Sequence, residues 1–269
     1  MSLTIFCSQK GSPGTSLSAM AIAASWPARE GRTRLLLEAD PSGGVLALRY
    51  GLGREPGLLT LATAVRHGST TTGDILENAQ TLPGGLLTVV APEHSSSIEA
   101  AFRAAGTGLG KALSEARDLD VIVDIGRLTS GSPAASLLSF ADAVFMVARP
   151  TPEQIVPGAE QLRGVRNAHW CLIGEKPYSA DHVAETFGIP AFVIADDARG
   201  AGAIVSGGSA KKVRRSDLVR SARELAEAID TAVNPAILGE PASEPEVAEV
   251  LPPPPSPSNS LVDPIVTPQ

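Results

Sequence analysis

The sequence of 269 residues has few aromatic side chains and few cysteines. Aromatic residues make up 4% of the chain although 43% of it is hydrophobic, so a core would consist mainly of aliphatic and small side chains. Both cysteines, Cys7 and Cys171, lie inside apolar runs, which argues against a disulfide framework and fits a reducing compartment. The histidines are scattered and share no metal-binding spacing with the cysteines, so a zinc site is not expected.

Long apolar segments are also missing. No run approaches the roughly 20 apolar residues that span a bilayer, and the N-terminus lacks the basic, apolar and small-residue segments of a secretion signal. We therefore expect a cytoplasmic protein with no membrane span. A Gly-x-Ser-x-Gly nucleophile turn is absent too, which argues against a serine hydrolase of the α/β type.

Basic residues are absent from the end of the chain. Residues 239–269 contain five acidic residues and neither lysine nor arginine, so this segment holds five of the seven net negative charges and the first 238 residues carry only -2. From about Ala236 the sequence is rich in proline, and the run Pro252–Pro255 favours extended backbone. We predict one main domain over residues 1–235 and a disordered, acidic, Pro-rich tail over residues 236–269, which is either a docking peptide for a partner or an inert solvated segment.

Short aliphatic runs alternate with helix-like segments through most of the chain. Runs such as 121–123 are apolar without alternation, which is typical of parallel strands covered on both faces. Four apolar residues repeat at helical spacing between Leu218 and Ile229 and indicate a covering helix. We predict an α/β fold of three layers, in which a mostly parallel twisted sheet has helices on both faces. The expected strands are Leu3–Ser8, Thr33–Ala39, Leu86–Ala91, Val121–Asp124, Ala143–Ala148, Trp170–Ile173 and Ala191–Ala195.

A glycine-rich segment follows the first expected strand and runs into a helical stretch. Gly11 and Gly14 let the backbone approach a phosphate closely, successive N–H groups can point at it, and the start of the helix adds partial positive charge. Ser16 is placed where its hydroxyl could reach a magnesium ion bound to a nucleotide. The spacing does not fit the Gly-x-Gly-x-x-Gly turn of dinucleotide-binding proteins, which disfavours hydride transfer. Taken alone, this segment is equally compatible with a plain tight turn.

The segment resembles the deviant phosphate loop KGGxGKT of the ParA/MinD family of P-loop proteins. The resemblance implies a Rossmann-like P-loop NTPase fold with ATP and Mg2+ as ligands. Lys10 matches the signature lysine, which in that family reaches across a dimer to the phosphates of the partner's nucleotide, and Ser16 matches the hydroxyl that binds magnesium. Thr15 stands where the family has its general phosphate-loop lysine. The implied nucleotide-binding residues are Lys10, Gly11, Ser12, Pro13, Gly14, Thr15, Ser16 and Leu17.

Two later segments extend the resemblance to the ends of two further strands. Residues 35–44 resemble the family's strand that ends in Asp-x-Asp-Pro, so Asp40 matches the carboxylate that orients the attacking water. Glu38 replaces the first aspartate and is expected to keep a contact to the hydration shell of the metal. Residues 121–124 resemble the Walker B strand, whose terminal acid is Asp124 here. The resemblance thus implies Lys10 and Asp40 as catalytic residues and Ser16, Asp40 and Asp124 as magnesium ligands, direct or through water.

The sequence also departs from the family's pattern. The Thr-Pro-Pro segment that usually follows the Walker B acid is replaced by residues 125–127, Ile-Gly-Arg. Gly174 stands where relatives that hold adenine present asparagine. Thr15 removes a cation from the phosphates, and because a charged hydrogen bond contributes about 1.5 to 3 kcal/mol, its loss predicts binding roughly 10- to 100-fold weaker. The resemblance covers about residues 1–230 and includes an acidic turn at residues 196–199.

A cluster of basic residues near position 212 is a second candidate site. Side chains of this kind could neutralise DNA phosphates without reading sequence, which would suit a partition protein. An ordinary solvated surface is the alternative, because Glu224 and Glu227 on the following helix dilute the positive charge. The cluster consists of Lys211, Lys212, Arg214 and Arg215, followed by Arg220 and Arg223.

Three hypotheses follow. The first is a ParA/MinD-like ATP-binding protein that acts as a nucleotide-dependent homodimer in positioning or partitioning a cellular cargo through an unknown protein partner, with slow hydrolysis. The second is a pseudo-ATPase scaffold that keeps the fold and acts through protein–protein contacts. The third is a partition ATPase that binds DNA nonspecifically. A membrane-cycling protein is disfavoured, since an acidic Pro-rich end would be repelled by anionic lipid.

Overall fold

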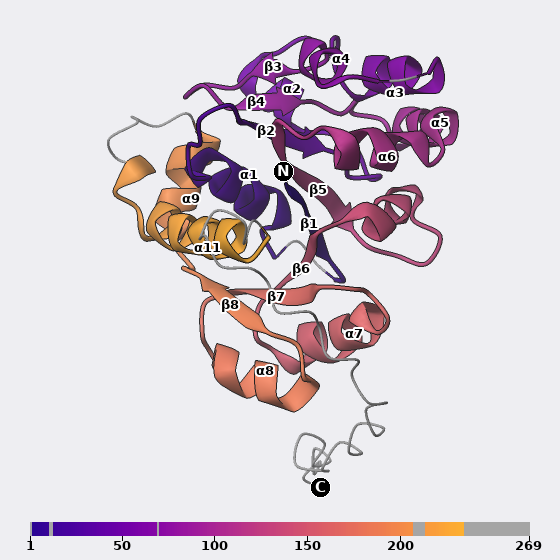
Figure 1. The fold of residues 1–269 in the computed structure, drawn as a ribbon. Helices are drawn as coiled ribbons and strands as arrows, with labels where there is room; N and C mark the ends of the chain where they lie inside the picture. Colours follow the sequence, from indigo (N-terminus) through magenta and orange to yellow (C-terminus); the bar gives the residue numbers. More distant parts are fainter. Residues whose placement is uncertain (1, 11–12, 69, 207–212, 234–269) are drawn as a thin grey trace, which may run out of the picture. The chain divides into compact units, whose positions relative to one another are not determined.

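A single eight-stranded sheet forms the centre of the structure (Figure 1). This computed structural model describes residues 2–10, 13–68, 70–206 and 213–233. The strand order is β3-β4-β2-β5-β1-β6-β7-β8, and every neighbouring pair is parallel except β3 and β4. The strands are β1 (Ser2–Ser8), β2 (Thr33–Glu38), β3 (Gln80–Thr81), β4 (Leu87–Val89), β5 (Leu119–Arg127), β6 (Ala143–Ala148), β7 (Ala168–Ile173) and β8 (Ala191–Ile194).

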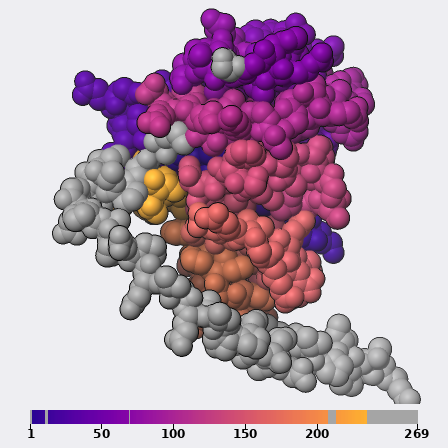
Figure 2. Space-filling view, turned by 45° about the vertical axis from the view of Figure 1, so that its right-hand side comes forward, coloured from indigo at the N-terminus to yellow at the C-terminus, as the bar shows by residue number. Residues whose placement is uncertain are grey.

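Helices cover both faces of this sheet, which confirms the predicted α/β architecture (Figure 1). One layer contains α1 (Thr15–Ser25), α2 (Leu46–Tyr50), α9 (Ala198–Val205) and α11 (Asp217–Val233). The opposite layer contains α3 (Leu58–Arg66), α4 (Thr72–Glu77), α5 (Ser95–Ala105), α6 (Gly108–Glu115), the 3-10 helix η1 (Pro133–Phe140), α7 (Pro152–Leu162) and α8 (Ala180–Phe187). In the space-filling view, purple, magenta and salmon surfaces follow one another from the top of the described part downward (Figure 2).

Two apolar layers hold the sheet between the helices. Leu3, Ile5 and Cys7 of β1 belong to the layer on one face and Phe6 belongs to the other, as the alternation of side chains along a strand requires. These four side chains of β1 are fully buried, which fits a central strand covered on both sides. The predicted covering helix is α11, and its apolar residues pack beside α1.

The two cysteines lie in the core, as the apolar runs around them predict. Cys7 and Cys171 are buried free thiols, and burial raises the pKa of Cys7 to about 12. Among the described residues, no helix is both long and apolar enough to cross a bilayer. The tail predicted over residues 236–269, and Lys211 and Lys212 of the basic cluster, lie outside the described residues.

Candidate functional site

The glycine-rich loop lies at the point where the sheet changes its direction of growth. After β1 the chain moves to β2 and β4 on one side, returns through β5, and then continues to β6, β7 and β8 on the other side. In open α/β sheets, ligands bind beyond the carboxyl ends of the strands at such a switch point. The loop that joins β1 to α1 therefore occupies the position where this topology places a ligand.

The described part of the loop leads directly into α1. Gly14 is the N-cap of α1 with φ of 112°, a left-handed conformation that favours glycine, and its carbonyl accepts a hydrogen bond from Ser18 at 2.8 Å. Pro13 is buried, the Leu17 side chain packs against the α1-side core, and Gly11 and Ser12 lie outside the described residues. Thr15 is 6% exposed and its hydroxyl has no hydrogen-bond partner among the described residues.

Asp124 and Ser16 meet at the start of α1. Asp124 on β5 is buried, and one of its carboxylate oxygens accepts a hydrogen bond from the backbone N–H of Gly126 at 2.9 Å. Burial raises the pKa of Asp124 to about 6, against the opposing effect of a hydrogen bond from the Ser16 side chain. The structure therefore brings together the hydroxyl and the carboxylate that the sequence singled out as magnesium ligands, although they are 108 positions apart.

The side chain of Asp40, two residues beyond the end of β2, lies near Asp124. Its carboxylate accepts a hydrogen bond from the backbone N–H of Ser42 at 2.8 Å, and its negative charge adds to the elevation of the pKa of Asp124. A β-carbon placed on Gly126 would lie 2.0 Å from Cγ of Asp40, so the carboxylate packs directly on the α-carbon of this glycine. Gly126 has φ of 58° and follows the β5 acid where the family pattern has proline. Only a residue without a side chain leaves Asp40 in this position.

Glu38 has a structural role that the sequence did not predict. Its carboxylate is 2% exposed and accepts backbone hydrogen bonds from Val45 at 2.7 Å, Leu46 at 3.0 Å and Ala91 at 2.9 Å. Burial raises the pKa of Glu38 while these three donors lower it. The carboxylate ties the start of α2 and the segment after β4 to the end of β2, and its contact to the hydration shell of a metal stays a prediction.

Lys10 is exposed and lies close enough to the start of α7 to interact with an acid of its own chain. The pKa of Glu153 is lowered, chiefly by a hydrogen bond from its own backbone N–H and further by the charge of Lys10. This places a positive and a negative side chain beside the loop. The sequence offered no signal for this proximity, since the two residues are 143 positions apart.

An ion pair joins the ends of β6 and β8 across the end of β7. Arg149, the first residue after β6, donates hydrogen bonds to both carboxylate oxygens of Asp196, at 2.6 and 3.1 Å. Gly174, the first residue after β7, has φ of 76°, and its N–H donates to the carbonyl of Ile194 at 2.8 Å. A β-carbon on Gly174 would stand 3.4 Å from the β-carbon of Asp196. The sequence pointed to Gly174 and to the acidic turn but not to Arg149.

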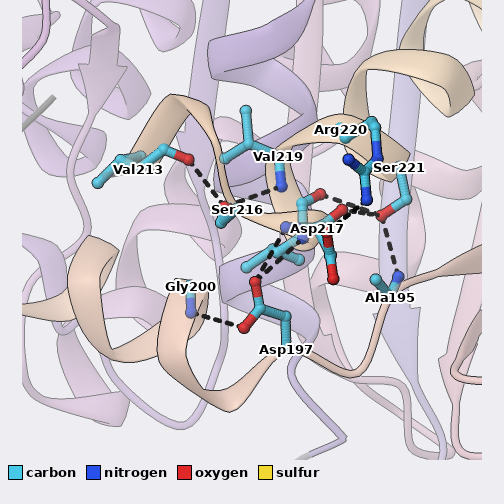
Figure 3. A network of polar contacts seen from close by, with 10 residues as sticks. Ala195, Asp197, Gly200, Val213, Ser216, Asp217, Val219, Arg220 and Ser221 are labelled. Carbon is cyan, nitrogen blue, oxygen red and sulfur yellow. Dashed lines mark hydrogen bonds and ion pairs between the residues drawn. The ribbon is translucent and has the colours of Figure 1, made fainter. Parts of the chain in front are cut away.

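The acidic turn itself is fixed by Asp197 (Figure 3). One carboxylate oxygen of Asp197 accepts a hydrogen bond from the backbone N–H of Gly200 at 2.8 Å. The other oxygen accepts from the backbone N–H groups of Asp217 at 3.0 Å and Leu218 at 3.4 Å. These donors, the Gly200 N–H first, lower the pKa of Asp197. The side chain thus caps α9 and α11 together and holds the segment that carries Asp196.

Comparison with known proteins adds the fold family. No protein-family model matches the sequence, and no curated protein matches it either. Among solved structures, the ParA family ATPase from Chlorobium tepidum TLS aligns with a TM-score of 0.69 and 17% identity, over 84% of this chain and 98% of that one. The chain has the ParA/MinD fold.

Two MinD structures support the same conclusion. The cell division ATPase MinD of Pyrococcus furiosus aligns with a TM-score of 0.64 and 15% identity, over 86% of this chain and 100% of that chain. The septum site-determining protein MinD of Pyrococcus horikoshii OT3, complexed with Mg-ADP, aligns with a TM-score of 0.62 and 17% identity, over 86% and 97%. At this level of identity the ParA/MinD likeness concerns the fold.

The residues at the switch point fit a magnesium nucleotide better than a metal ion held by protein alone. Within the described ranges, no three His, Cys, Asp or Glu residues are placed to hold a metal ion. Magnesium at a nucleotide needs few protein ligands, because phosphate oxygens and water complete its octahedral shell. In this ParA/MinD fold Ser16 and Asp124 supply a hydroxyl and a carboxylate of that kind. The buried, unpartnered hydroxyl of Thr15 beside them is a donor that an anion could satisfy.

Proposed function

We propose that this chain is a ParA/MinD-like protein that binds ATP with Mg2+, forms a nucleotide-dependent homodimer, and positions or partitions a cellular cargo through a partner protein. The observation that carries the proposal is the convergence of Ser16, Asp124 and Asp40 beneath a glycine-rich loop at the switch point of the sheet. The Mg-ADP complex of the Pyrococcus horikoshii MinD, which shares the fold, is consistent with this ligand.

Each converging residue has a defined task in this proposal. Ser16 and Asp124 hold the magnesium ion, the first through its hydroxyl and the second through water. Asp40, held in place on Gly126, orients the attacking water. The bound metal stabilises the charge that develops on the phosphates. Hydrolysis is slow, because Thr15 provides a hydroxyl where a phosphate-loop lysine would provide a full positive charge.

Calorimetric titration with ATP tests the proposal, with and without magnesium. We expect the wild type to bind only with magnesium, and Ser16→Ala to weaken this binding at least tenfold because the metal loses a ligand. Ser25→Ala, at the other end of α1, is the matched control and should bind like the wild type. Thr15→Lys should tighten binding by about 1.5 to 3 kcal/mol, because an ammonium group adds a charged hydrogen bond to the phosphates.

The second candidate function, a scaffold that no longer uses nucleotide, is favoured by Thr15 and Gly174. A site that has lost nucleotide binding would leave the wild type and Thr15→Lys equally unable to bind ATP. That result, obtained at high protein concentration, would end the case for a working nucleotide site and leave the fold as a surface for protein contacts.

The third candidate, nonspecific DNA binding, rests on exposed basic residues ahead of α11. Arg214 and Arg215 are exposed, whereas Arg220 forms an ion pair with Asp217 and is less available. Binding of this kind weakens steeply as salt rises, because released counterions drive it. A nonspecific duplex titrated at several salt concentrations should show this slope for the wild type and a smaller slope for Arg214→Ala/Arg215→Ala. No binding at low salt would exclude DNA as a partner.

A further inference from the structure

The ion pair between Arg149 and Asp196 presents a flat cation at the edge of the sheet. Its two hydrogen bonds, of 2.6 and 3.1 Å, join both terminal nitrogens to both carboxylate oxygens. A bidentate pair of this kind fixes the plane of the guanidinium. The two side chains nevertheless remain 46% and 49% exposed, so the ion pair is accessible from solvent.

The pair spans the end of β7, and Gly174 lies beneath it. Arg149 follows β6 and Asp196 lies two residues beyond β8, while β7 is the strand between them. A β-carbon placed on Gly174 would lie 3.4 Å from the β-carbon of Asp196, which is an ordinary van der Waals contact. The N–H of Gly174 is already bonded to the carbonyl of Ile194. Gly174 therefore offers neither a side chain nor a free donor that could read the edge of a base.

The distance from the phosphate loop suits the base of a nucleotide. The loop follows β1, and β7 and β8 lie two and three strands away in the sheet. At about 4.8 Å between strands, this separation is about 10 to 14 Å. A nucleotide whose phosphates lie at the loop can extend along the carboxyl edge of the sheet and bring its base to this ion pair. The guanidinium also points toward β8, away from the phosphate loop.

We propose, resting on the nucleotide site proposed above, that Arg149 held flat by Asp196 is the surface on which the base stacks, and that adenine and guanine are accepted alike. A guanidinium plane stacks on aromatic rings, and stacking tolerates any base because every base has a π-face. In this proposal both oxygens of Asp196 serve to hold Arg149 and do not read the base. Gly174 likewise does not select adenine.

The test uses the full chain and three ligands: Mg-ATP, Mg-GTP and magnesium tripolyphosphate, which has no base. By calorimetry the wild type should bind ATP and GTP within about threefold of each other. Arg149→Ala should weaken both nucleotides about 5- to 100-fold, the usual effect of losing one base-stacking contact. Its affinity for tripolyphosphate should stay within about twofold of the wild type. Arg149→Lys keeps the charge and the partner but loses the plane, and it should weaken the nucleotides in the same way.

The control is Arg54→Ala, which removes the exposed arginine of the Arg54–Glu93 ion pair and should change none of the affinities. Equal losses for nucleotides and tripolyphosphate in Arg149→Ala would overturn the inference, because Arg149 would then act on phosphate. Wild-type affinity for nucleotides in Arg149→Lys, or a tenfold preference between ATP and GTP, would also overturn it. A wild type that binds none of the three ligands would instead refute the nucleotide site itself.

Discussion

Asp124 is a carboxylate that the fold buries beside two other acids. Its pKa of about 6 lies above the ordinary value of 3.8, because burial penalises the charged form and Asp40 and Glu38 repel it. The folded chain therefore holds a proton on Asp124 more tightly than the unfolded chain does. The stability that this proton contributes is complete below about pH 4 and is lost as the pH rises through 6.

Asp124→Asn should consequently stabilise the chain at neutral pH when no nucleotide or metal is present. One pKa unit corresponds to about 1.4 kcal/mol, so the gain at pH 7.5 is at most about 3 kcal/mol, and it should vanish at pH 4. Urea unfolding at the two pH values measures it. Asp118→Asn, which changes an exposed acid just before β5, is the control and should have no such effect. A destabilised Asp124→Asn at pH 7.5 would show that the charged carboxylate is needed to hold the loop.

At the level of elements, one side chain fixes the starts of two helices. Asp197 accepts hydrogen bonds at the beginning of α9 and of α11, so Asp197→Ala should lose two caps and cost about 1 to 3 kcal/mol of unfolding free energy. Because its pKa is lowered from 3.8, the contribution is present above that pH and is lost as the pH falls through the lower folded value. Urea unfolding at pH 7 measures the cost. Asp181→Ala, in the first turn of α8, is a control that should cost clearly less, and equal costs would contradict the double cap.

The central strands could be predicted from the sequence because each is a continuous apolar run. All seven expected runs are strands, with ends that shift by a few residues. The missing strand is β3, two residues at the edge of the sheet, which has no pattern to detect. The sequence also placed Ser16, Asp40 and Asp124 at strand or helix ends, where a parallel sheet brings them to one edge. It did not predict the bonds of Glu38 to Ala91 or of Arg149 to Asp196, because such partners are set by tertiary packing.

For the whole molecule, the strand order decides which residues can cooperate. The switch at β1 places the acids of β2 and β5 on one side of the glycine-rich loop and the ends of β6, β7 and β8 on the other. One side thus carries the carboxylates suited to a metal ion and water. The other side carries the guanidinium of Arg149, and Gly174 there has no amide side chain that could hydrogen-bond a base. This division is why the proposed effect of Thr15 on phosphate affinity and the proposed effect of Gly174 on base selectivity can be tested separately.

The end of the chain contributes charge to the whole molecule, and its removal is the last prediction. Deleting residues 239–269 removes five acidic residues and no basic one, which changes the net charge from -7 to -2. Because this segment has few apolar side chains to bury, we expect the melting temperature to change by no more than about 1 °C. If the chain binds nonspecific duplex through Arg214 and Arg215, the deletion should strengthen this binding at low salt, because fewer acidic residues repel the DNA phosphates. A full-length control with the five acids replaced by their amides separates charge from length. It should reproduce the gain in duplex binding, and a drop of many degrees in the deletion alone would show that the segment packs on the domain.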